Sequence, residues 1–172
     1  MNIREAEYAD TDRLAPMILQ AAAHQQLLDP QRYGLVDDLK TNYRRWLGKI
    51  AEDPRMTVLV AEDESELVGF LLASVEKDAP IYRTGEFGVI HDLWVNEAYR
   101  KRRVGVSLVK AMQEKFELVG IKQIRVEAIA GDSIVHHLFG SCGFRPCTSL
   151  MLYEKPEPKR RKKSSDGNSV QQ

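Results

Sequence analysis

The chain has 172 residues, of which 43% are hydrophobic and 29% charged, and its formal net charge is zero. This length predicts a single domain, and the composition is ordinary for a soluble globular protein. No apolar run approaches the ~18 residues of a membrane span, so we expect a cytoplasmic protein. The two cysteines, Cys142 and Cys147, are too few for a disulfide framework and are expected as free thiols.

The charge is unevenly distributed along the chain. Residues 156–172 contain five basic residues against Glu157 and Asp166, a net charge of +3, which leaves residues 1–155 with a net of −3. The tail is polar and poor in apolar side chains, which predicts a disordered segment after a folded domain at 1–155. No aromatic residues interleave the basic run, so a solubilising extension is favoured over nucleic-acid binding. No membrane partner is expected.

The first half of the chain predicts a strand, two helices and a β-hairpin. Residues 2–8 alternate as a strand does, and Asp10 is a suitable N-cap for a following helix that Pro16 should kink or reset. Residues 56–62 and 67–74 predict two paired strands around an acidic turn. Between the first helix and this hairpin a second helix is expected, with an apolar face formed by Val36, Leu39, Tyr43, Trp46 and Ile50.

The second half is organised around one strand, its turn and its helix. Residues 88–95 are rich in β-branched and aromatic side chains, which predicts a buried strand. Residues 124–128 predict a half-buried strand, Asp132 caps a short helix, and residues 149–154 predict a final strand. The helix after the turn should end near Gly120, and its apolar stripe is Val104, Leu108, Met112, Phe116 and Val119.

The order of these elements is β-α-α-β-β-β-α-β-α-β, which predicts an α/β (α+β) fold around one sheet. The strand, helix and strand between residues 89 and 127 form a crossover. Such a crossover joins two parallel strands, so we expect one parallel pair in the sheet.

The turn between residues 96 and 103 has the chemistry of a phosphate site. The first turn of a helix leaves about four backbone N–H groups without an intrahelical partner, and the helix dipole adds positive potential there. Four basic side chains flank these donors: Arg100, Lys101, Arg102 and Arg103. The sequence therefore predicts that a phosphate group binds at this helix start.

Residues 88–107 resemble the acyl-CoA signature of the GNAT superfamily of N-acetyltransferases, whose turn has the pattern Arg/Gln-x-x-Gly-x-Gly/Ala. Arg100, Val104 and Gly105 fit that pattern, whereas Arg103 replaces the central glycine. The resemblance covers the whole expected domain, residues 1–155. It implies a GNAT-like mixed sheet of about six to seven strands flanked by about four helices. It further implies a parallel strand pair that splays apart to admit the cofactor.

The resemblance implies acetyl-CoA as co-substrate, held by the strand end, the turn, the helix start and the last helix. Arg103 should weaken or displace CoA binding, and it still offers its backbone N–H if the turn keeps helical φ/ψ. Asp132 and Phe139 stand where the family usually has an asparagine and a tyrosine, and phenylalanine cannot protonate the leaving sulfur. The implied cofactor-binding residues are Leu93, Trp94, Val95, Arg100, Lys101, Arg102, Arg103, Val104, Gly105, Val106, Ser107, Asp132 and Phe139.

His91 and Asp92 are the candidate catalytic residues. A histidine with its ordinary pKa of about 6.5 accepts a proton near neutrality, and an aspartate binds an ammonium or takes its proton through a water. Neighbouring strand residues face opposite sides, but the β-bulge that the family has in this strand would bring both to the cleft. A hydrogen-bonded structural role for His91 stays open, and Glu86 and Glu127 are secondary candidates for contact with the amine.

The resulting hypothesis is an N-acetyltransferase that moves an acetyl group from acetyl-CoA to a primary amine by direct attack. A polyamine, an amino acid, an amino sugar and a protein amine all remain open as acceptors. Phe139 and Arg103 motivate the alternative, a catalytically weak acyl-CoA-binding sensor. No metal is expected, because His136 and His137 are neighbours on a helix and point about 100° apart. The sequence leaves a homodimer open.

Overall fold

The computed structural model describes residues 1–155, apart from the side chains at positions 40, 44 and 51. These residues form one sheet of β1 (Asn2–Glu5), β2 (Met56–Asp63), β3 (Glu66–Lys77), β4 (Glu86–Val95) and β5 (Ile124–Val126), in that order. The helices are α1 (Thr11–Leu28), α2 (Leu39–Glu52), α3 (Val104–Leu118) and α4 (Ser133–Ser141), with short 3₁₀ turns η1 (Tyr8–Asp10) and η2 (Glu97–Tyr99). The predicted α/β class is confirmed. The tail predicted to be disordered, residues 156–172, lies outside the described residues.

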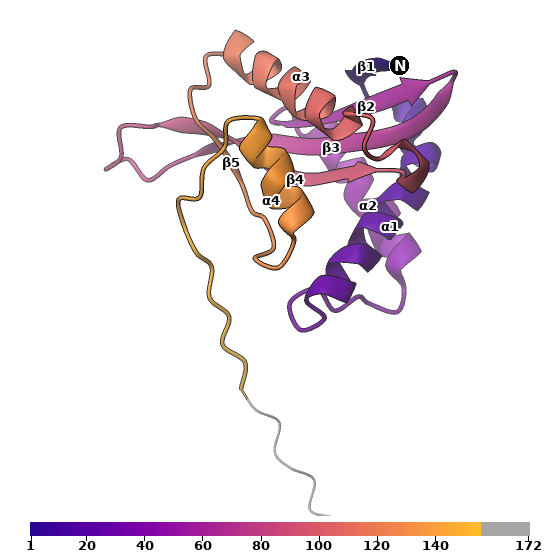
Figure 1. The fold of residues 1–172 in the computed structure, drawn as a ribbon, viewed down its shortest axis with the longest axis horizontal. Coiled ribbons are helices and arrows are strands. Elements are labelled where there is room, and N and C mark those ends of the chain that lie inside the picture. Colours follow the sequence, from indigo (N-terminus) through magenta and orange to yellow (C-terminus); the bar gives the residue numbers. More distant parts are fainter. Residues whose placement is uncertain (156–172) are drawn as a thin grey trace, which may run out of the picture.

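The sheet separates two hydrophobic cores (Figure 1). α3 and α4 cover one face, where Met112 belongs to the same buried cluster as Leu71 of β3. α1 and α2 cover the other face, where Met17 and Tyr43 cluster with Phe70. Successive side chains of a strand point to opposite faces, so β3 supplies both cores. Phe70 and Leu71 are accordingly both 0% exposed.

The strand connections follow the expected pattern. β1 to β4 pair antiparallel with their neighbours, and β4 pairs parallel with β5 through the α3 crossover, as predicted. The β2–β3 hairpin turns on Glu64 and Ser65, whose φ values of 47° and 71° are both positive. A two-residue loop with positive φ at both positions is typical of the type I′ turn, whose twist matches that of the flanking strands.

Two details of the N-terminal helices differ from the expectation. α1 runs through Pro16 as one helix and is not reset there. α2 begins at Leu39, so Val36 lies outside it, and Trp46 is 40% exposed rather than buried. Side chains spaced four and three residues apart lie on one face of a helix. The buried side chains of α2 follow this spacing, and they are Tyr43, Leu47 and Ile50.

The final strand predicted at residues 149–154 is not formed. Residues 145–155 contain neither helix nor strand and run away from the sheet (Figure 1). The described part of the chain therefore has five strands rather than the six to seven that the resemblance implied. Alternating apolar residues suit a strand, but a strand also needs a partner that completes its hydrogen bonds. The segment has no such partner among residues 1–155.

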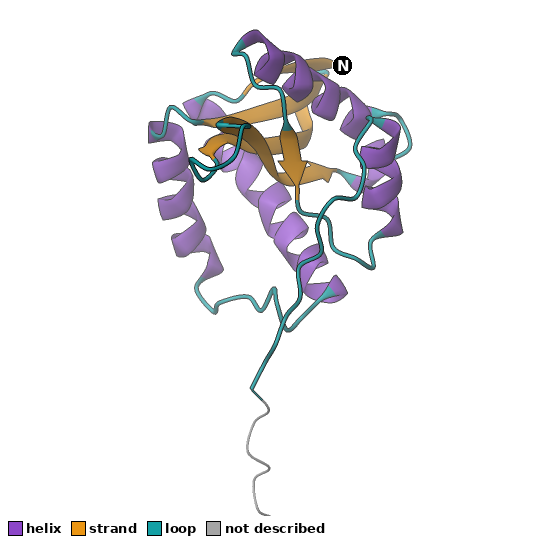
Figure 2. Ribbon diagram, turned by 90° about the vertical axis from the view of Figure 1, so that its left-hand side faces the viewer, coloured by secondary structure: helices purple, strands orange, loops and turns teal. Residues whose placement is uncertain are grey.

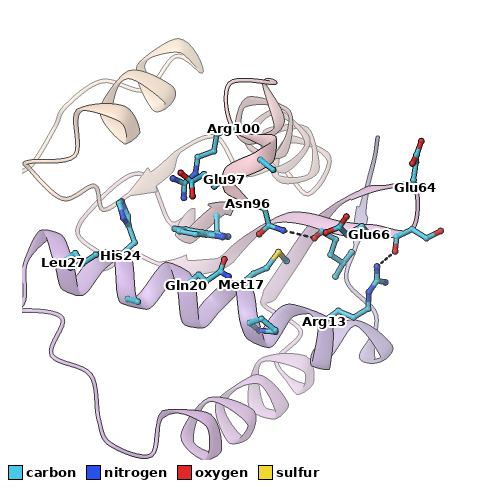
Figure 3. Close-up of a pocket in the computed structure, with 16 residues that line it drawn as sticks. Arg13, Met17, Gln20, His24, Leu27, Glu64, Glu66, Asn96, Glu97 and Arg100 are labelled. Carbon is cyan, nitrogen blue, oxygen red and sulfur yellow. Dashed lines mark hydrogen bonds between the residues drawn. The ribbon is translucent and has the colours of Figure 1, made fainter.

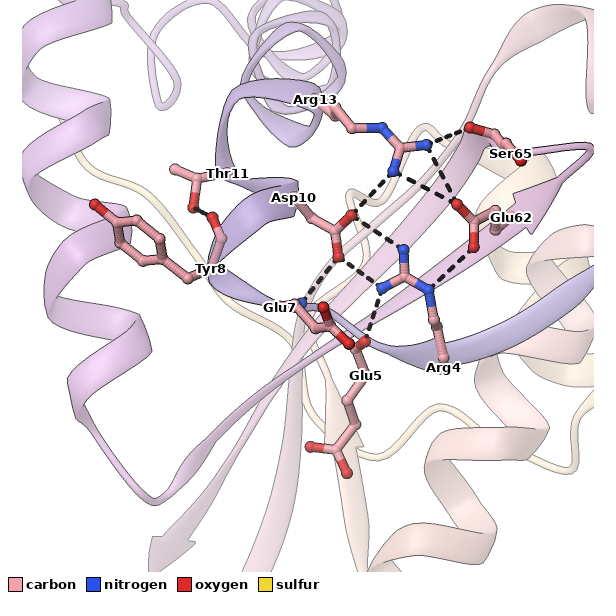
Figure 4. A network of polar contacts seen from close by, with 9 residues as sticks. All are labelled: Arg4, Glu5, Glu7, Tyr8, Asp10, Thr11, Arg13, Glu62 and Ser65. Atoms are coloured by element: carbon pink, nitrogen blue, oxygen red, sulfur yellow. Dashed lines mark hydrogen bonds and ion pairs between the residues drawn. The ribbon is translucent and has the colours of Figure 1, made fainter.

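Asp10 has a different role from the predicted N-cap, because its carboxylate makes no capping bond to α1. It is 3% exposed and accepts two hydrogen bonds from the Arg4 guanidinium, at 2.6 and 3.0 Å, and one from the N–H of Glu7 (Figure 4). Arg4 also donates to Glu62 of β2, and Arg13 of α1 donates to both Asp10 and Glu62. This network fastens the start of α1 to β1 and β2.

The turn before α3 also departs from expectation. Arg103, the N-cap residue, has φ 63° and ψ 11°, which is the left-handed region rather than the helical one. Lys101 has φ 62°, whereas Arg102 between them does not have a positive φ. The left-handed region costs a residue with a Cβ about 1–2 kcal/mol, and glycine adopts it freely. The chain keeps a glycine-type backbone at position 103 while carrying an arginine there.

We expect Asp10→Asn to lower the free energy of unfolding by about 2 kcal/mol at pH 7, because Arg4 loses its buried anionic partner. The hydrogen bond from Arg4 lowers the pKa of Asp10. The stabilisation is therefore present above the ordinary carboxyl pKa and is lost as the pH falls through the lowered value. Urea unfolding at pH 7 and about pH 2 measures both effects. Exposed Glu117→Gln is the control, and an equal loss at both pH values would contradict the assignment.

We expect Arg103→Gly to stabilise the protein by about 0.5–1 kcal/mol, because relief of the left-handed strain exceeds the added entropy of the unfolded chain. The matched control is Arg102→Gly, which relieves no strain and should destabilise by a similar amount. Thermal unfolding followed by circular dichroism should show shifts of opposite sign, each about 2 °C. Two shifts of the same sign would show that strain at position 103 does not govern the effect.

Candidate active site

β4 contains one extra residue relative to β3, and that residue is His91. In the β3–β4 register Leu72 lies opposite Asp92 and Ala73 lies opposite Ile90, so His91 has no partner. An extra residue of this kind is a β-bulge, which bends the strand and re-aims the side chains beside it. The bulge that the resemblance implied is therefore present in β4, at the candidate catalytic residues.

The bulge places His91 and Asp92 on the same face of the sheet. The residues on either side of this pair pack into the core beneath α3 and α4. Nε2 of His91 lies 2.7 Å from the hydroxyl of Ser74 on β3. Asp92 accepts a hydrogen bond of 3.0 Å from Gln25 of α1. Both side chains therefore meet groups on the face that α1 and α2 cover.

The two side chains differ in their surroundings. His91 is 34% exposed, and its Nε2 lies 3.9 Å from the Glu76 carboxylate. Burial raises the pKa of Asp92 above its usual range, while the hydrogen bond from Gln25 and the charge of His91 act in the opposite direction. A desolvated carboxylate binds a proton or a cation more strongly than one in water. Asp92 therefore has the character of a cation or proton acceptor.

β4 and β5 separate close to the bulge. Their parallel register ends at the pair Ile90–Val126. From that pair onward a cavity of about 80 Å³ lies between residues 90–94 of β4 and residues 126–129, which begin at the last residue of β5. Gln25 of α1 and Phe139 of α4 also line it. The splayed parallel pair is thus present, and both His91 and Asp92 line the gap.

The start of α3 presents backbone donors close to the end of β4. The first helical hydrogen bond runs from the N–H of Ser107 to the carbonyl of Arg103, at 2.9 Å. No backbone carbonyl within residues 1–155 accepts a hydrogen bond from the N–H groups of residues 101–106. Free donors at a helix start, together with the helix dipole, form an anion site.

Two of the four basic side chains around these donors stack on aromatic rings. The guanidinium of Arg100 lies 4.7 Å from the Trp94 ring centroid, and that of Arg102 lies 5.1 Å from the Tyr99 ring centroid. Stacking holds both side chains near the turn while leaving N–H groups free to meet an anion. Lys101 and Arg103 are exposed. The turn is therefore positively charged on its solvent side.

Several of the remaining predicted cofactor residues use their side chains in packing, which leaves only their backbone groups for a ligand. Leu93, Val95 and Val106 pack against the core under α3 and α4, where Val104 is buried. A Cβ at Gly105 would lie 2.7 Å from Cδ1 of Leu138, so glycine here allows α4 to approach α3 closely.

Asp132 caps α4, as predicted, by accepting hydrogen bonds from the N–H groups of Ile134 and Val135 at 3.1 and 3.0 Å. Its other carboxylate oxygen lies 3.8 Å from Nε2 of His24. Phe139 is 5% exposed and packs edge-on against a neighbouring phenylalanine. It presents only carbon to the cavity, so the side chain at this position donates no proton.

A groove of about 920 Å³ opens beside the cavity on the face of α1 (Figure 3). It follows α1 from Arg13 to Leu27, and the start of β3 and the end of β4 form its opposite wall. His24 and Trp94 line both the groove and the cavity, so the two spaces meet at these side chains. Nε1 of Trp94 is buried and has no hydrogen-bond partner among the described residues.

Sequence reasoning did not find every residue that the fold brings to the site. Gln25 and Ser74 lie far from β4 in the chain, and no motif marks them. The secondary candidate Glu127 already accepts a hydrogen bond of 2.6 Å from Arg32 of the α1–α2 connection. The other secondary candidate, Glu86, lies at the opposite end of β4 from the bulge.

Within residues 1–155, no group of three or more His, Cys, Asp or Glu side chains is arranged to hold a metal ion. None of the helices within residues 1–155 has the length and apolar character needed to cross a membrane.

Solved structures share this architecture. A Bacillus halodurans protein has a TM-score of 0.80 at 19% identity, over 90% of this chain and 100% of that one. The aminoglycoside 6'-N-acetyltransferase of Acinetobacter haemolyticus has a TM-score of 0.72 at 16% identity, over 91% and 99% of the two chains. A second aminoglycoside N-acetyltransferase, solved in complex with CoA, has a TM-score of 0.68 at 15% identity, over 90% and 99%. At such identities the likeness concerns the fold.

Comparison with curated protein sequences gives no significant match. The model of the Acetyltransferase (GNAT) family matches residues 21–144, a span that contains β4 with its bulge, the turn before α3 and the splayed pair. With most of the chain matched and the fold shared, this protein belongs to the GNAT family of acetyltransferases.

Proposed function

We propose that this protein is an N-acetyltransferase that transfers an acetyl group from acetyl-CoA to a primary amine by direct attack. The observation that carries the proposal is the bulge in β4. It directs His91 and a desolvated Asp92 to one face, at the gap between the splayed strands. A base and an anionic amine-binding group at the same gap are what aminolysis of a thioester requires.

The residues present fit acetyl-CoA. The unbonded N–H groups of residues 101–106 suit the oxygens of a pyrophosphate, and exposed Lys101 and Arg103 add positive charge. β4 has no neighbouring strand beyond Ile90 on the β5 side, which leaves room for an extended chain to lie along residues 93–95. When bound, acetyl-CoA would supply an activated thioester carbonyl.

Asp92 and His91 have different roles toward the amine: Asp92 binds it and His91 accepts its proton. A primary amine is protonated at neutral pH and must lose a proton before it attacks. Asp92, desolvated and held by Gln25, binds the ammonium in the gap. His91, in contact with the Ser74 hydroxyl and partly open to solvent, accepts the proton and passes it outward. The groove along α1 is the path by which the amine arrives, because it meets the cavity at His24 and Trp94.

The CoA sulfur can leave without a proton donated by the side chain at position 139. Phe139 offers no proton. A CoA thiol resembles cysteine, whose pKa is about 8.5, so its thiolate is a tolerable leaving group without a general acid. The free donors at the α3 start hold the pyrophosphate and do not contact the sulfur. Release as thiolate therefore accounts for transfer without a tyrosine.

The second candidate function is an acyl-CoA sensor with little or no catalysis. The observation that favours it is Phe139, which is packed into the core where a general acid would otherwise stand. Such a module would use the same anion site and gap but would have no need of the pair on the bulge. Turnover therefore separates the two functions.

We expect Asp92→Asn to lower kcat/KM for the amine by about 10²–10⁴-fold, because the amide neither binds the ammonium nor carries charge. Burial raises the pKa of Asp92, so the wild-type carboxylate opposes folding at pH 7, and the neutral amide should leave Tm unchanged or raised. Exposed Glu114→Gln is the control. Steady-state kinetics and thermal unfolding measure the two effects. A folded Asp92→Asn protein with wild-type kcat/KM would remove Asp92 from the mechanism.

The proposed function is tested by titrating the full chain with acetyl-CoA in a calorimeter and then assaying thiol release with pooled primary amines. We expect binding followed by amine-dependent release of CoA. Binding without release, across polyamines, amino acids, amino sugars and peptides, would favour the sensor.

The anion site is tested in the same titration by Lys101→Glu, which should weaken acetyl-CoA binding about tenfold, as expected for the loss of one charge-assisted contact. Lys110→Glu, the same change on the exposed side of α3 and away from the turn, should bind as the wild type does. Equal affinities of the two variants would overturn the assignment of the pyrophosphate to the turn.

A further inference from the structure

We propose that Ser74 and Glu76 of β3 are positioning residues, which fix the hydrogen of the neutral His91 imidazole on Nε2 and so make Nδ1 the atom that accepts the proton of the amine. This inference rests on the proposed acetyl transfer, because it assigns the atom of His91 that acts as the base. It starts from a polar side chain buried in the sheet. Ser74 is 5% exposed, and it and Asp10 are the two polar residues that are buried in the described part of the chain.

The hydroxyl of Ser74 interrupts an apolar face of β3. Alternate residues of a strand share one face, and Phe70 and Leu72, which precede Ser74 on this face, are buried in the core under α1 and α2. Helices flank the sheet on both sides, so either face of a central strand meets a helical layer (Figure 2). A hydroxyl buried in such a layer costs free energy unless it is hydrogen-bonded. Ser74 therefore needs polar partners, and the structure supplies two.

The bulge in β4 supplies the first partner. Val89 lies opposite Ser74 in the β3–β4 register, and His91 is the unpaired residue two positions later. The insertion brings the imidazole to the face that Ser74 occupies, with Nε2 2.7 Å from the hydroxyl oxygen. The second partner is Glu76, two residues along β3 and on the same face, whose Oε1 lies 3.4 Å from the same hydroxyl. Ser74 therefore lies between His91 and Glu76.

The Glu76 carboxylate decides how the hydrogens are arranged. A carboxylate only accepts hydrogen bonds, whereas a hydroxyl has one hydrogen to donate and lone pairs that accept. Ser74 therefore donates its hydrogen to Oε1 of Glu76, and its oxygen accepts the hydrogen of Nε2 of His91. Oε1 of Glu76 also lies 3.9 Å from Nε2, so a lone pair on Nε2 would face a negative charge. Both contacts favour hydrogen on Nε2.

Nδ1 of His91 is left as the base. A neutral imidazole has one N–H and one lone pair, so hydrogen on Nε2 puts the lone pair on Nδ1. No hydrogen bond to Nδ1 is formed by any group in the described part of the chain. In the reaction an N–H bond of the ammonium held at Asp92 breaks, an Nδ1–H bond forms, and the free amine attacks the thioester. The resulting imidazolium lies beside the Glu76 carboxylate, which stabilises its positive charge.

The position of the hydrogen is measured by long-range proton–nitrogen NMR of the full chain at about pH 8.5, where an ordinary histidine is neutral. The His91 signals are identified by their loss in His91→Gln. We expect hydrogen on Nε2 in the wild type. Glu76→Ala frees the Ser74 hydrogen to donate to Nε2, so a large share of the imidazole hydrogen should move to Nδ1. Hydrogen on Nδ1 in the wild type, or an unchanged tautomer in Glu76→Ala, would refute the proposal.

The matched control for the NMR measurement is Lys77→Ala. Lys77 is the next residue of β3, so its side chain points to the opposite face of the sheet, where it lies 3.5 Å from Glu86. This variant should keep the wild-type tautomer of His91. A shift of the hydrogen to Nδ1 in Lys77→Ala as large as that in Glu76→Ala would show that the tautomer does not depend on the carboxylate.

Kinetics test the consequence for catalysis. Ser74→Ala and Glu76→Ala should each lower kcat about tenfold, a part of the 10²–10⁴-fold that a general base contributes, and leave KM for acetyl-CoA unchanged. Lys77→Ala should keep the wild-type kcat, and circular dichroism checks that all three variants are folded. Wild-type kcat in both Ser74→Ala and Glu76→Ala would remove the pair from the mechanism while leaving the proposed function intact. Absence of turnover with every amine would refute the proposed function, and the NMR result alone would then decide the position of the hydrogen.

Discussion

One extra residue in β4 decides where the candidate catalytic residues are located. In a regular strand His91 and Asp92 would face opposite sides of the sheet, and one of them would be buried under α3. The unpaired position of His91 in the β3–β4 register turns both to the α1 face. The same distortion lies next to the last β4–β5 pair, Ile90 with Val126, so the gap opens where the side chains converge. The candidate site and the gap beside it therefore arise at one irregularity in one strand.

Two residues of the candidate site, Asp92 and Arg103, are in environments that are unfavourable for the stability of the fold. Asp92 is desolvated, which raises its pKa and makes its charged form unfavourable for folding. Arg103 occupies a left-handed backbone position that glycine would adopt without strain. Away from the site, the Arg4–Asp10 network is nearly fully paired and fastens α1 to the sheet. That network holds α1, whose Gln25 contacts Asp92, so it supports one wall of the gap.

Local signals were sufficient to predict the frame of this fold. The β4 strand, the α3 stripe and the Asp132 cap follow from periodicity and capping chemistry, which depend on neighbours in sequence. The network role of Asp10 depends on Arg4 and Arg13, which also reach Glu62 of β2, so capping propensity alone gave the wrong role. The left-handed backbone at Arg103 has no counterpart in the propensity of arginine. Gln25 reaches Asp92 across 67 positions of sequence and carries no motif, which is why it was not found. The bulge itself came from the family resemblance and not from the residues.

The short length of β5 links the sheet edge to the site. β5 has three paired residues, and the chain that follows it directly lines the cavity opposite His91 and Asp92. Backbone beyond a short edge strand has few sheet hydrogen bonds to hold it, so side-chain contacts matter more there. Here the Arg32 guanidinium donates to the Glu127 carboxylate, which ties the chain after β5 to the α1–α2 connection. The width of the gap therefore depends on this side-chain contact as well as on the three β4–β5 pairs.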